Sequence, residues 1–146
     1  DSIPGISMIC YTPNAGHDLA EGWKAFPSLS AFFGITIAGG DYPVCDYSAG
    51  EKDGEVLLSV KTSTGVPDKV VFWYSVSADQ DFRNEDWRDS VIVQPGKSSF
   101  EIPVKKPASG YKAFFIDLHY KSPAGGDYTH GTRMFVADSL RLLVQD

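Results

Sequence analysis

From residue 54 onward, apolar and polar positions alternate in short runs, and turns rich in glycine, proline and aspartate separate the runs. Alternation with a period of two is typical of strands that bury one face. The pattern predicts strands over residues 55–62, 69–77, 87–93, 98–104, 111–120, 128–136 and 140–144. Because no helical pattern of useful length interrupts them, this part favours a small antiparallel β-sandwich of the immunoglobulin-like or fibronectin-III-like type.

The first forty residues show a different pattern. Residues 6–11 form a short apolar run of strand type, and apolar positions after residue 17 fall at helical spacing. Pro27 lies inside the helical pattern, and proline is tolerated only in the first turn of a helix. We therefore expect a turn after residue 17 and a new helix that begins near Pro27. The pair Gly39-Gly40 predicts where this helix ends.

These patterns divide the chain into three parts. Residues 1–40 are predicted to form a strand, a loop and a helix, residues 41–53 a linker, and residues 54–146 the sandwich. The linker prediction rests on the glycine, proline and acidic residues of this stretch. The predicted fold class is therefore mainly β, an antiparallel sandwich preceded by a short strand–loop–helix segment.

Composition narrows the class of protein. The chain has 146 residues, of which 42% are hydrophobic and 13% aromatic, so it can bury a substantial core. A net charge of −6 argues against nucleic acid and against anionic membrane surfaces as partners. No apolar run approaches the length of about 20 residues that a membrane-spanning helix needs. Cys10 and Cys45 leave two alternatives open, one disulfide or two free buried thiols.

His17 is the strongest candidate for catalysis. It follows the apolar run in the segment Tyr11-Thr-Pro-Asn-Ala-Gly-His-Asp-Leu19. A strand, a tight turn with histidine at its tip and a following helix form the layout in which α/β-hydrolases present their general base, after the nucleophilic Ser and the acid in chain order. The partners of His17 are therefore expected upstream of this chain. No Gly-x-Ser-x-Gly motif occurs here, so this chain alone is not expected to hydrolyse a substrate.

The acidic stretch over residues 79–89 is the candidate contact surface, because it concentrates charge and aromatic rings in a loop. It departs from the calcium-binding EF-hand pattern, which requires Gly where Asn84 stands. We expect Arg83 and Arg88 to neutralise the carboxylates, and Trp87 to pack beneath the loop. The binding candidates are thus Arg83, Trp87 and Arg88. A carbohydrate platform built on Trp87 is an open alternative.

His119 and His130 fall on adjacent strands of a predicted hairpin. Paired across it, they would supply two ligands of a metal site, but no third ligand of convincing spacing appears. We therefore predict two solvent-facing histidines, no metal and no cofactor.

Several separated motifs occur in an order that resembles the PhoPQ-activated pathogenicity-related proteins. They are residues 11–19, Ala31-Phe-Phe33, Asp81-Phe-Arg83 followed by Trp87, Gly110-Tyr-Lys-Ala-Phe-Phe115 and Gly131-Thr-Arg-Met-Phe-Val136. The resemblance implies the C-terminal part of an α/β-hydrolase-like, virulence-associated protein with an appended sandwich. It implies that His17 is the triad histidine, and that the protein is secreted or lies in the periplasm or cell envelope.

Two functions from different classes follow. The first is the end of a serine hydrolase of esters or peptides, with the sandwich as an accessory or interaction module and an upstream hydrolase domain as its partner. The second is a non-catalytic binding or adhesion module for protein or carbohydrate, in which His17 is an ordinary loop residue. A helix separated from its parent sheet leaves an apolar face uncovered, so the chain is expected to self-associate or to pack the helix onto its own sandwich.

Overall fold

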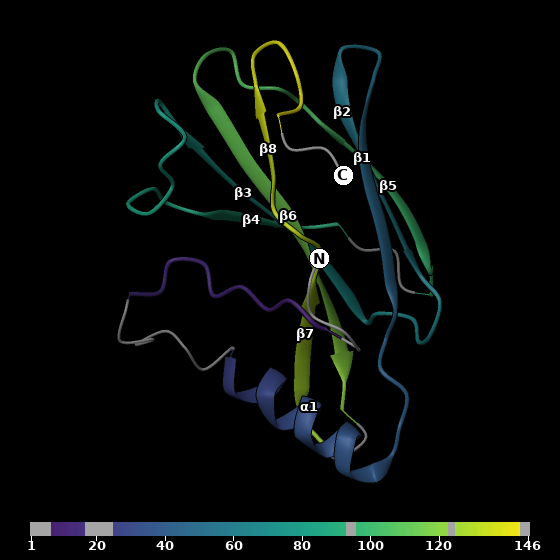
Figure 1. The fold of residues 1–146 in the computed structure, drawn as a ribbon. Helices are drawn as coiled ribbons and strands as arrows, with labels where there is room; N and C mark the ends of the chain where they lie inside the picture. The colour runs from purple at the N-terminus through teal and green to yellow at the C-terminus, as the bar shows by residue number, and fades with distance from the viewer. Residues whose placement is uncertain (1–6, 17–24, 93–95, 123–124, 144–146) are drawn as a thin grey trace.

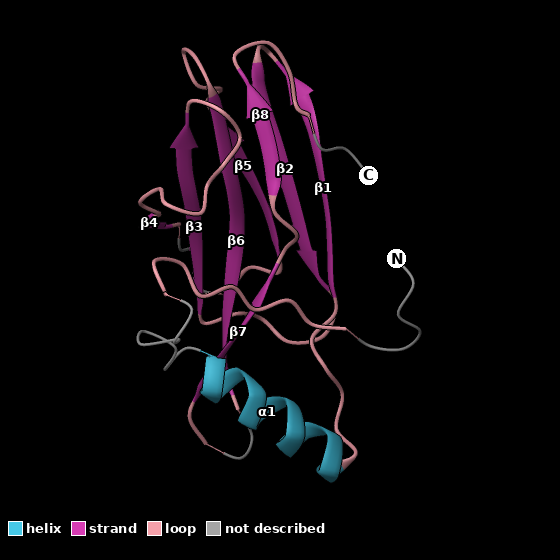
Figure 2. Cartoon of the chain, turned by 60° about the vertical axis from the view of Figure 1, so that its left-hand side comes forward, coloured by secondary structure: helices cyan, strands magenta, loops and turns pink. Residues whose placement is uncertain are grey.

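The computed structural model describes residues 7–16, 25–92, 96–122 and 125–143 (Figure 1). Within them, two antiparallel sheets pack against each other and one helix lies across an end of the pair (Figures 1 and 2). The elements are α1 (Ala25–Ala38), β1 (Cys45–Lys52), β2 (Glu55–Thr62), β3 (Lys69–Ser77), β4 (Arg88–Val91), β5 (Ser99–Val104), β6 (Tyr111–Lys121), β7 (Asp127–Gly131) and β8 (Phe135–Asp138). The protein is a mainly β sandwich, as the sequence predicts.

One sheet has the order β1-β2-β5, and the other has the order β4-β3-β6-β7 with β8 also paired to β6. The main core lies between the sheets and includes Leu58 from β2, Ile102 from β5, Ile116 from β6 and Phe135 from β8. The predicted strands over residues 55–62 and 69–77 coincide with β2 and β3 residue for residue. β2 buries one row of side chains in this core, whereas β3 directs Val70 into it and buries Val71 and Trp73 on its other face. The assignment to the immunoglobulin-like or fibronectin-III-like type stays a prediction.

The stretch predicted as a linker, residues 41–53, contains strand β1, which corrects that prediction. β1 pairs along its whole length with β2, from Cys45 opposite Thr62 to Lys52 opposite Glu55. Asp53 and Gly54 form the turn between them, with φ of +52° and +81°. Two successive positive φ values are what a tight two-residue hairpin requires, and Asp-Gly is a favoured sequence there. The sequence pattern does not predict β1 because few of its side chains are apolar. The fully buried row of side chains in this hairpin belongs to β2.

The strand predicted over residues 128–136 is two strands. β7 pairs with the last residues of β6, whereas β8 pairs with its first residues. Thr132 separates them: its hydroxyl accepts from the Ile116 N–H at 3.1 Å, while its own N–H donates to the Ile116 carbonyl at 2.9 Å. Thr132 thus continues the hydrogen bonding to β6 at the point where the chain passes from β7 to β8. The strand predicted over residues 140–144 is reduced to one bridge between Ala137 and Leu142 in its described part.

Helix α1 begins at Ala25, so Pro27 lies in its first turn as predicted. It ends at Ala38, directly before Gly39, whose φ is +64°, and the Gly40 N–H donates to the Ile35 carbonyl at 3.0 Å. The helix packs on β7 through a narrow buried face of Ser28, Ala31 and Ile35. Its other face is apolar and is not covered by the described residues, with Leu29 53%, Phe33 56% and Ile37 84% exposed. Among the described residues, no helix is long and apolar enough to cross a membrane.

The strand predicted over residues 6–11 is absent from the described residues 7–11. The segment makes one isolated bridge, from Ile9 to Gly131. Gly131 is the last residue of β7, and the Thr129 N–H, two residues earlier on the same edge, donates to the Ser28 hydroxyl of α1 at 3.1 Å. The pairing of this segment with β7 therefore stops after one bridge. The segment is extended and lies on the outer face of the five-stranded sheet without becoming one of its strands.

Candidate functional site

Residues 7–16, which lead to His17, are attached to the outer face of the five-stranded sheet at three points. The first is the bridge at Ile9, whose carbonyl accepts from the Gly131 N–H at 2.6 Å. The second is Tyr11, whose hydroxyl accepts from the Met134 N–H at 3.2 Å. Burial raises the pKa of the Tyr11 hydroxyl above its ordinary value, so it stays neutral at physiological pH.

An aromatic cluster surrounds Phe115 on this outer face. Phe115 is 1% exposed, and its ring centroid lies 4.6 Å from that of Tyr11, 5.5 Å from Trp87 and 6.4 Å from Trp73. Aromatic pairs at these separations contribute about 0.5–1.5 kcal/mol each beyond the area that they bury. Tyr11 therefore covers a second, smaller core that the sandwich does not cover with its own strands.

The third attachment is a pair of hydrogen bonds from the side chain of Asn14. Its Nδ2 donates to the Trp87 carbonyl at 2.9 Å, and its Oδ1 accepts from the Trp87 N–H at 2.8 Å. The two residues are 73 positions apart in the sequence. His17 itself lies outside the described residues, so its role as general base stays a prediction. The structure describes the chain up to residue 16, directly before it.

The predicted contact surface is an ordered loop between β3 and β4. The Asp79 carboxylate accepts from the Asp81 N–H at 3.1 Å, and Asp81 in turn accepts from the Arg83 N–H at 3.1 Å. The Arg83 guanidinium forms an ion pair with Asp81 at 2.5 Å, and its side chain is 86% exposed. Hydrogen bonds from Arg83 lower the pKa of the Asp81 carboxyl to about 2. Arg83 thus neutralises a carboxylate, as expected of it.

Trp87 and Arg88 differ in their surroundings. The Trp87 ring is half-buried and packs against Phe82, at 6.3 Å between centroids, as well as against Phe115. It therefore serves as the anchor expected beneath the loop. Arg88 begins β4 and is exposed. The structure places Arg83, Trp87 and Arg88 at one edge of the five-stranded sheet, and of these three side chains only the two arginines are exposed.

The two strand histidines do not face the same way. Thr129 lies opposite His119 in the ladder, and His130 lies opposite Leu118, so the imidazoles project from opposite faces of the sheet. His130 is 7% exposed, which corrects the prediction that both are solvent-facing. Burial lowers the pKa of His130, although the nearby Pro43 carbonyl favours its protonated form. Among the described residues, no three His, Cys, Asp or Glu side chains come together in a group that could hold a metal ion.

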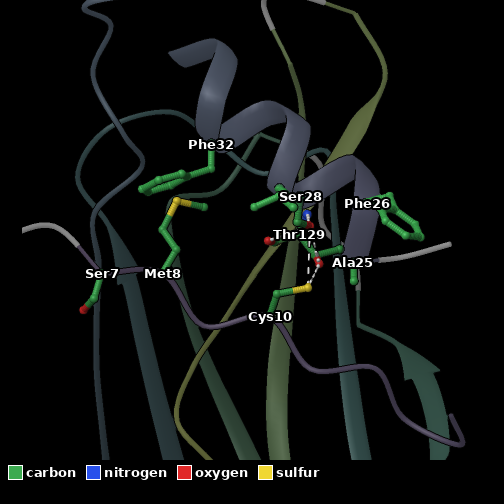
Figure 3. Close-up of a pocket in the computed structure, with 9 residues that line it drawn as sticks. Ser7, Met8, Cys10, Ala25, Phe26, Ser28, Phe32 and Thr129 are labelled. Carbon is green, nitrogen blue, oxygen red and sulfur yellow. Dashed lines mark hydrogen bonds between the residues drawn. The ribbon is translucent and has the colours of Figure 1, made fainter. Parts of the chain in front are cut away.

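Cys10 and Cys45 are free thiols, so the open alternative is resolved against a disulfide. Burial raises the pKa of the Cys45 thiol to about 12, so this thiol is not nucleophilic at neutral pH. Cys10 lies in a cavity of about 550 Å³ between α1 and the N-terminal segment (Figure 3). Its Sγ lies 3.4 Å from the Thr129 hydroxyl and 3.5 Å from that of Ser28. The Cys10 thiol and the two hydroxyl groups lie within hydrogen-bond distance of one another on the wall of a mainly apolar cavity.

Two long-range attachments are not predicted by the sequence, namely Asn14 to Trp87 and Ser28 to Thr129. A weak signal existed for the first, because asparagine is one of the few residues that tolerate a left-handed backbone, and Asn14 has φ of +59°. No local pattern could have named its partner. The signal for the aromatic cluster was stronger, since Phe114 and Phe115 are adjacent and therefore face opposite sides of one strand.

Comparison with known proteins gives one match. The family model described as PhoPQ-activated pathogenicity-related protein matches residues 1–83, which is more than half of the chain. The matched range includes the N-terminal segment, α1 and strands β1 to β3. No curated protein and no solved structure matches the chain.

Proposed function

The chain belongs to the PhoPQ-activated pathogenicity-related protein family, and from that membership we propose that it is the C-terminal part of an exported α/β-hydrolase-like protein. In this proposal His17 is the general base toward a serine that an upstream hydrolase domain supplies. The sandwich is an accessory module that carries the end of that domain. The substrate class is an ester or a peptide bond, since both require attack by an activated serine on a carbonyl carbon.

The observation that carries the proposal is the uncovered face of α1. The helix has the sequence AFPSLSAFFGITIA, which contains no charged residue. A helix with apolar side chains on opposite faces is normally buried on both faces, yet α1 packs on the sandwich with only one of them. Leu29, Phe33 and Ile37 recur at a spacing of four, so they form one stripe along the helix. A neighbouring domain packed on this stripe would complete its burial.

The chemistry assigned to His17 follows from its residue type and place in the chain. Imidazole has a pKa near neutrality, so it can remove the serine proton during attack and return it to the leaving group. The segment before it is fixed to the sheet at Ile9, Tyr11 and Asn14, which suits a base that must hold its geometry.

The test uses the intact protein, including the residues upstream of this chain. Labelling by a fluorophosphonate probe and hydrolysis of p-nitrophenyl acetate should both occur, and His17→Ala should lower them by at least 10³-fold. His119→Ala, which changes a histidine on β6, is the matched control and should keep both. An unlabelled wild-type protein, or a His17→Ala variant that hydrolyses the ester at the wild-type rate, would refute the proposal.

One observation favours the alternative, a non-catalytic binding module. The loop over residues 78–87 is held by its own hydrogen bonds and presents Arg83 beside the exposed edge strand β4, where Arg88 lies. Titration with cello-, chito- and malto-oligosaccharides, followed by tryptophan fluorescence, tests the carbohydrate version. Saturable quenching that disappears in Trp87→Ala and in Arg83→Ala/Arg88→Ala would support it, and flat titrations would remove it.

A further inference from the structure

Strand β1 is an edge strand, because the order of its sheet is β1-β2-β5. Figure 2 shows it outermost in this sheet, beside β2. An edge strand presents backbone N–H and C=O groups that can pair with another chain, so proteins normally shorten, interrupt or cover such edges. β1 is eight residues long and pairs along its whole length with β2, on one side only.

The other edges of the two sheets each carry one of these protections. β4 has only four residues, and β5 contains Pro103. Helix α1 covers β7, where the Thr129 N–H donates to Ser28, and the chain over residues 141–143 returns to bond with β8. β1 contains no proline, and no described segment other than β2 pairs with it. Within the described residues, β1 is therefore the long edge without protection.

The turn between β1 and β2 determines which backbone groups of β1 point outward. The two-residue turn Asp53-Gly54 makes Lys52 and Glu55 a hydrogen-bonded pair. Such pairs recur at every second residue, and the Val44 carbonyl, which accepts from the Ser63 N–H at 3.0 Å, follows the same alternation. The N–H and C=O groups that point away from β2 therefore belong to the residues between these pairs, namely Cys45, Tyr47, Ala49 and Glu51.

These outward groups allow β1 to pair with a second copy of itself. In an antiparallel pair with a two-fold axis at Ala49, Ala49 lies opposite its counterpart and Tyr47 lies opposite Glu51 of the second copy. Outward groups then meet outward groups throughout. The same register places Asp46 opposite Lys52 of the second copy on both sides of the axis, so opposite charges face each other. A register shifted by one residue would instead place Asp46 opposite Glu51.

The burial of β1 supports the same partner. Cys45, Tyr47 and Ala49 pack against the core but stay partly exposed, whereas the matching row of β2, which has a strand on each side, is fully buried. A second β1 beside the first would bring its own Tyr47 and Ala49 against this row. The added strand would thus remove apolar surface from water as well as satisfy the backbone groups.

We propose that β1 is a self-association edge, through which two copies of the protein join their three-stranded sheets into one continuous sheet. The occupant is a second copy because the two-fold register is complementary to itself both in hydrogen bonding and in charge. Pairing at this edge does not depend on the proposed hydrolase function, so each can fail without the other.

The experiment measures the oligomeric state of the intact protein by sedimentation velocity at rising concentration. The wild type should show a monomer–dimer equilibrium. Ala49→Pro should abolish the dimer, because proline removes an outward N–H at the axis and places its ring there. That N–H makes no bond to β2, so the variant should keep its far-UV circular dichroism spectrum.

Glu101→Pro on β5 is the matched control. Ser59 lies opposite both Ser48 of β1 and Glu101 of β5, and its backbone groups bond to β1. The Glu101 N–H therefore also points outward from an edge strand. The substitution makes the same change at the other edge of the same sheet, and the dimer should persist.

Charge reversal tests the register without placing proline in a strand. Asp46→Lys replaces two pairs of opposite charge by two pairs of like charge, so the dimer Kd should rise about 10-fold. The double variant Asp46→Lys/Lys52→Asp restores opposite charges at both positions and should return the Kd to the wild-type value.

Four results would overturn the proposal. The first is a wild type that stays monomeric, including one whose Tyr47, Ala49 and Glu51 amides are protected from hydrogen exchange, since another part of the protein would then occupy the edge. The second is a dimer that survives Ala49→Pro, because the contact would lie elsewhere. The third is an equal loss of the dimer in Glu101→Pro. The fourth is a double charge variant that associates no better than Asp46→Lys.

Discussion

Strands β2 and β6 lie in opposite sheets, and their burial differs in a way that explains the architecture. β2 alternates: Val56, Leu58 and Val60 are at most 2% exposed, and the residues between them are only half-buried. β6 is buried without interruption from Ala113 to Leu118. A strand that buries every side chain must be covered on both faces. The second sheet covers one face of β6, and the aromatic cluster with the N-terminal segment covers part of the other.

This difference shows that the N-terminal segment is a layer of the sandwich fold. In the sequence, residues 1–40 and residues 54–146 have separate patterns, which predict separate units. In the structure, Tyr11 packs on Phe115 and Asn14 bonds to Trp87, so part of the first unit covers the second. That packing is compatible with an upstream hydrolase domain, because α1 still presents an uncovered apolar face.

The largest expected effects come from the adjacent residues Phe114 and Phe115, which face opposite sides of β6. Both are at most 1% exposed, so each change to alanine should lower the free energy of unfolding by about 3–5 kcal/mol. If the outer face were an ordinary solvent face, Phe115→Ala would cost about 0.5 kcal/mol or less. Urea denaturation followed by far-UV circular dichroism measures both. Leu57→Ala, on the half-buried side of β2, is the control and should cost clearly less than Leu58→Ala.

A substitution at Tyr11, in the N-terminal segment on the outer face, should have an intermediate effect on the free energy of unfolding. Tyr11→Ala deletes the ring contact with Phe115 and the acceptor of the Met134 N–H, and should cost about 2 kcal/mol. Tyr11→Phe keeps the ring and should cost about 1 kcal/mol, which is the value of the hydrogen bond. Equal stability of wild type and Tyr11→Ala in urea would show that the N-terminal segment is not a layer of the fold.

The buried His130 predicts a smaller, pH-dependent effect on the inner side. Its pKa is lowered in the folded state by burial, so below pH 6.5 the unfolded chain binds a proton that the folded chain does not. Stability should therefore fall as the pH drops from 6.5 towards the folded pKa, and the contribution is complete above 6.5. Denaturation curves between pH 5 and 7.5 should show a shallower slope in His130→Gln than in wild type. An unchanged slope would contradict this assignment.

The smallest effect is expected on the uncovered face of α1. Ile37 is 84% exposed, so Ile37→Lys should change the stability of this chain by about 0.5 kcal/mol or less. Ile35→Lys, two residues away on the buried face, should cost several times more because Ile35 is 5% exposed. Thermal melts of the two variants give the comparison. In the intact protein, Ile37→Lys should become destabilising if the upstream domain covers this stripe.

The sequence by itself determined the class of the fold and the boundaries of its strongest strands. Alternation over residues 55–62 and 69–77 predicted β2 and β3, because successive side chains of a strand point to opposite faces, which gives a period of two. Pro27 and Gly39 predicted the limits of α1 from backbone sterics alone. The motif containing His17 identified a candidate base, again from local order along the chain.

Only the tertiary structure decided what each face contacts. β1 is a strand because β2 pairs with it. The segment before residue 17 lies on the sheet because Tyr11 packs on Phe115 and Asn14 bonds to Trp87. His130 is buried, and the backbone at Pro43, between α1 and β1, contacts it. Each of these depends on contacts between residues far apart in the chain. The local pattern shows which side chains are apolar and favour burial. It does not show which distant surface buries them, because that depends on the packing of the whole molecule.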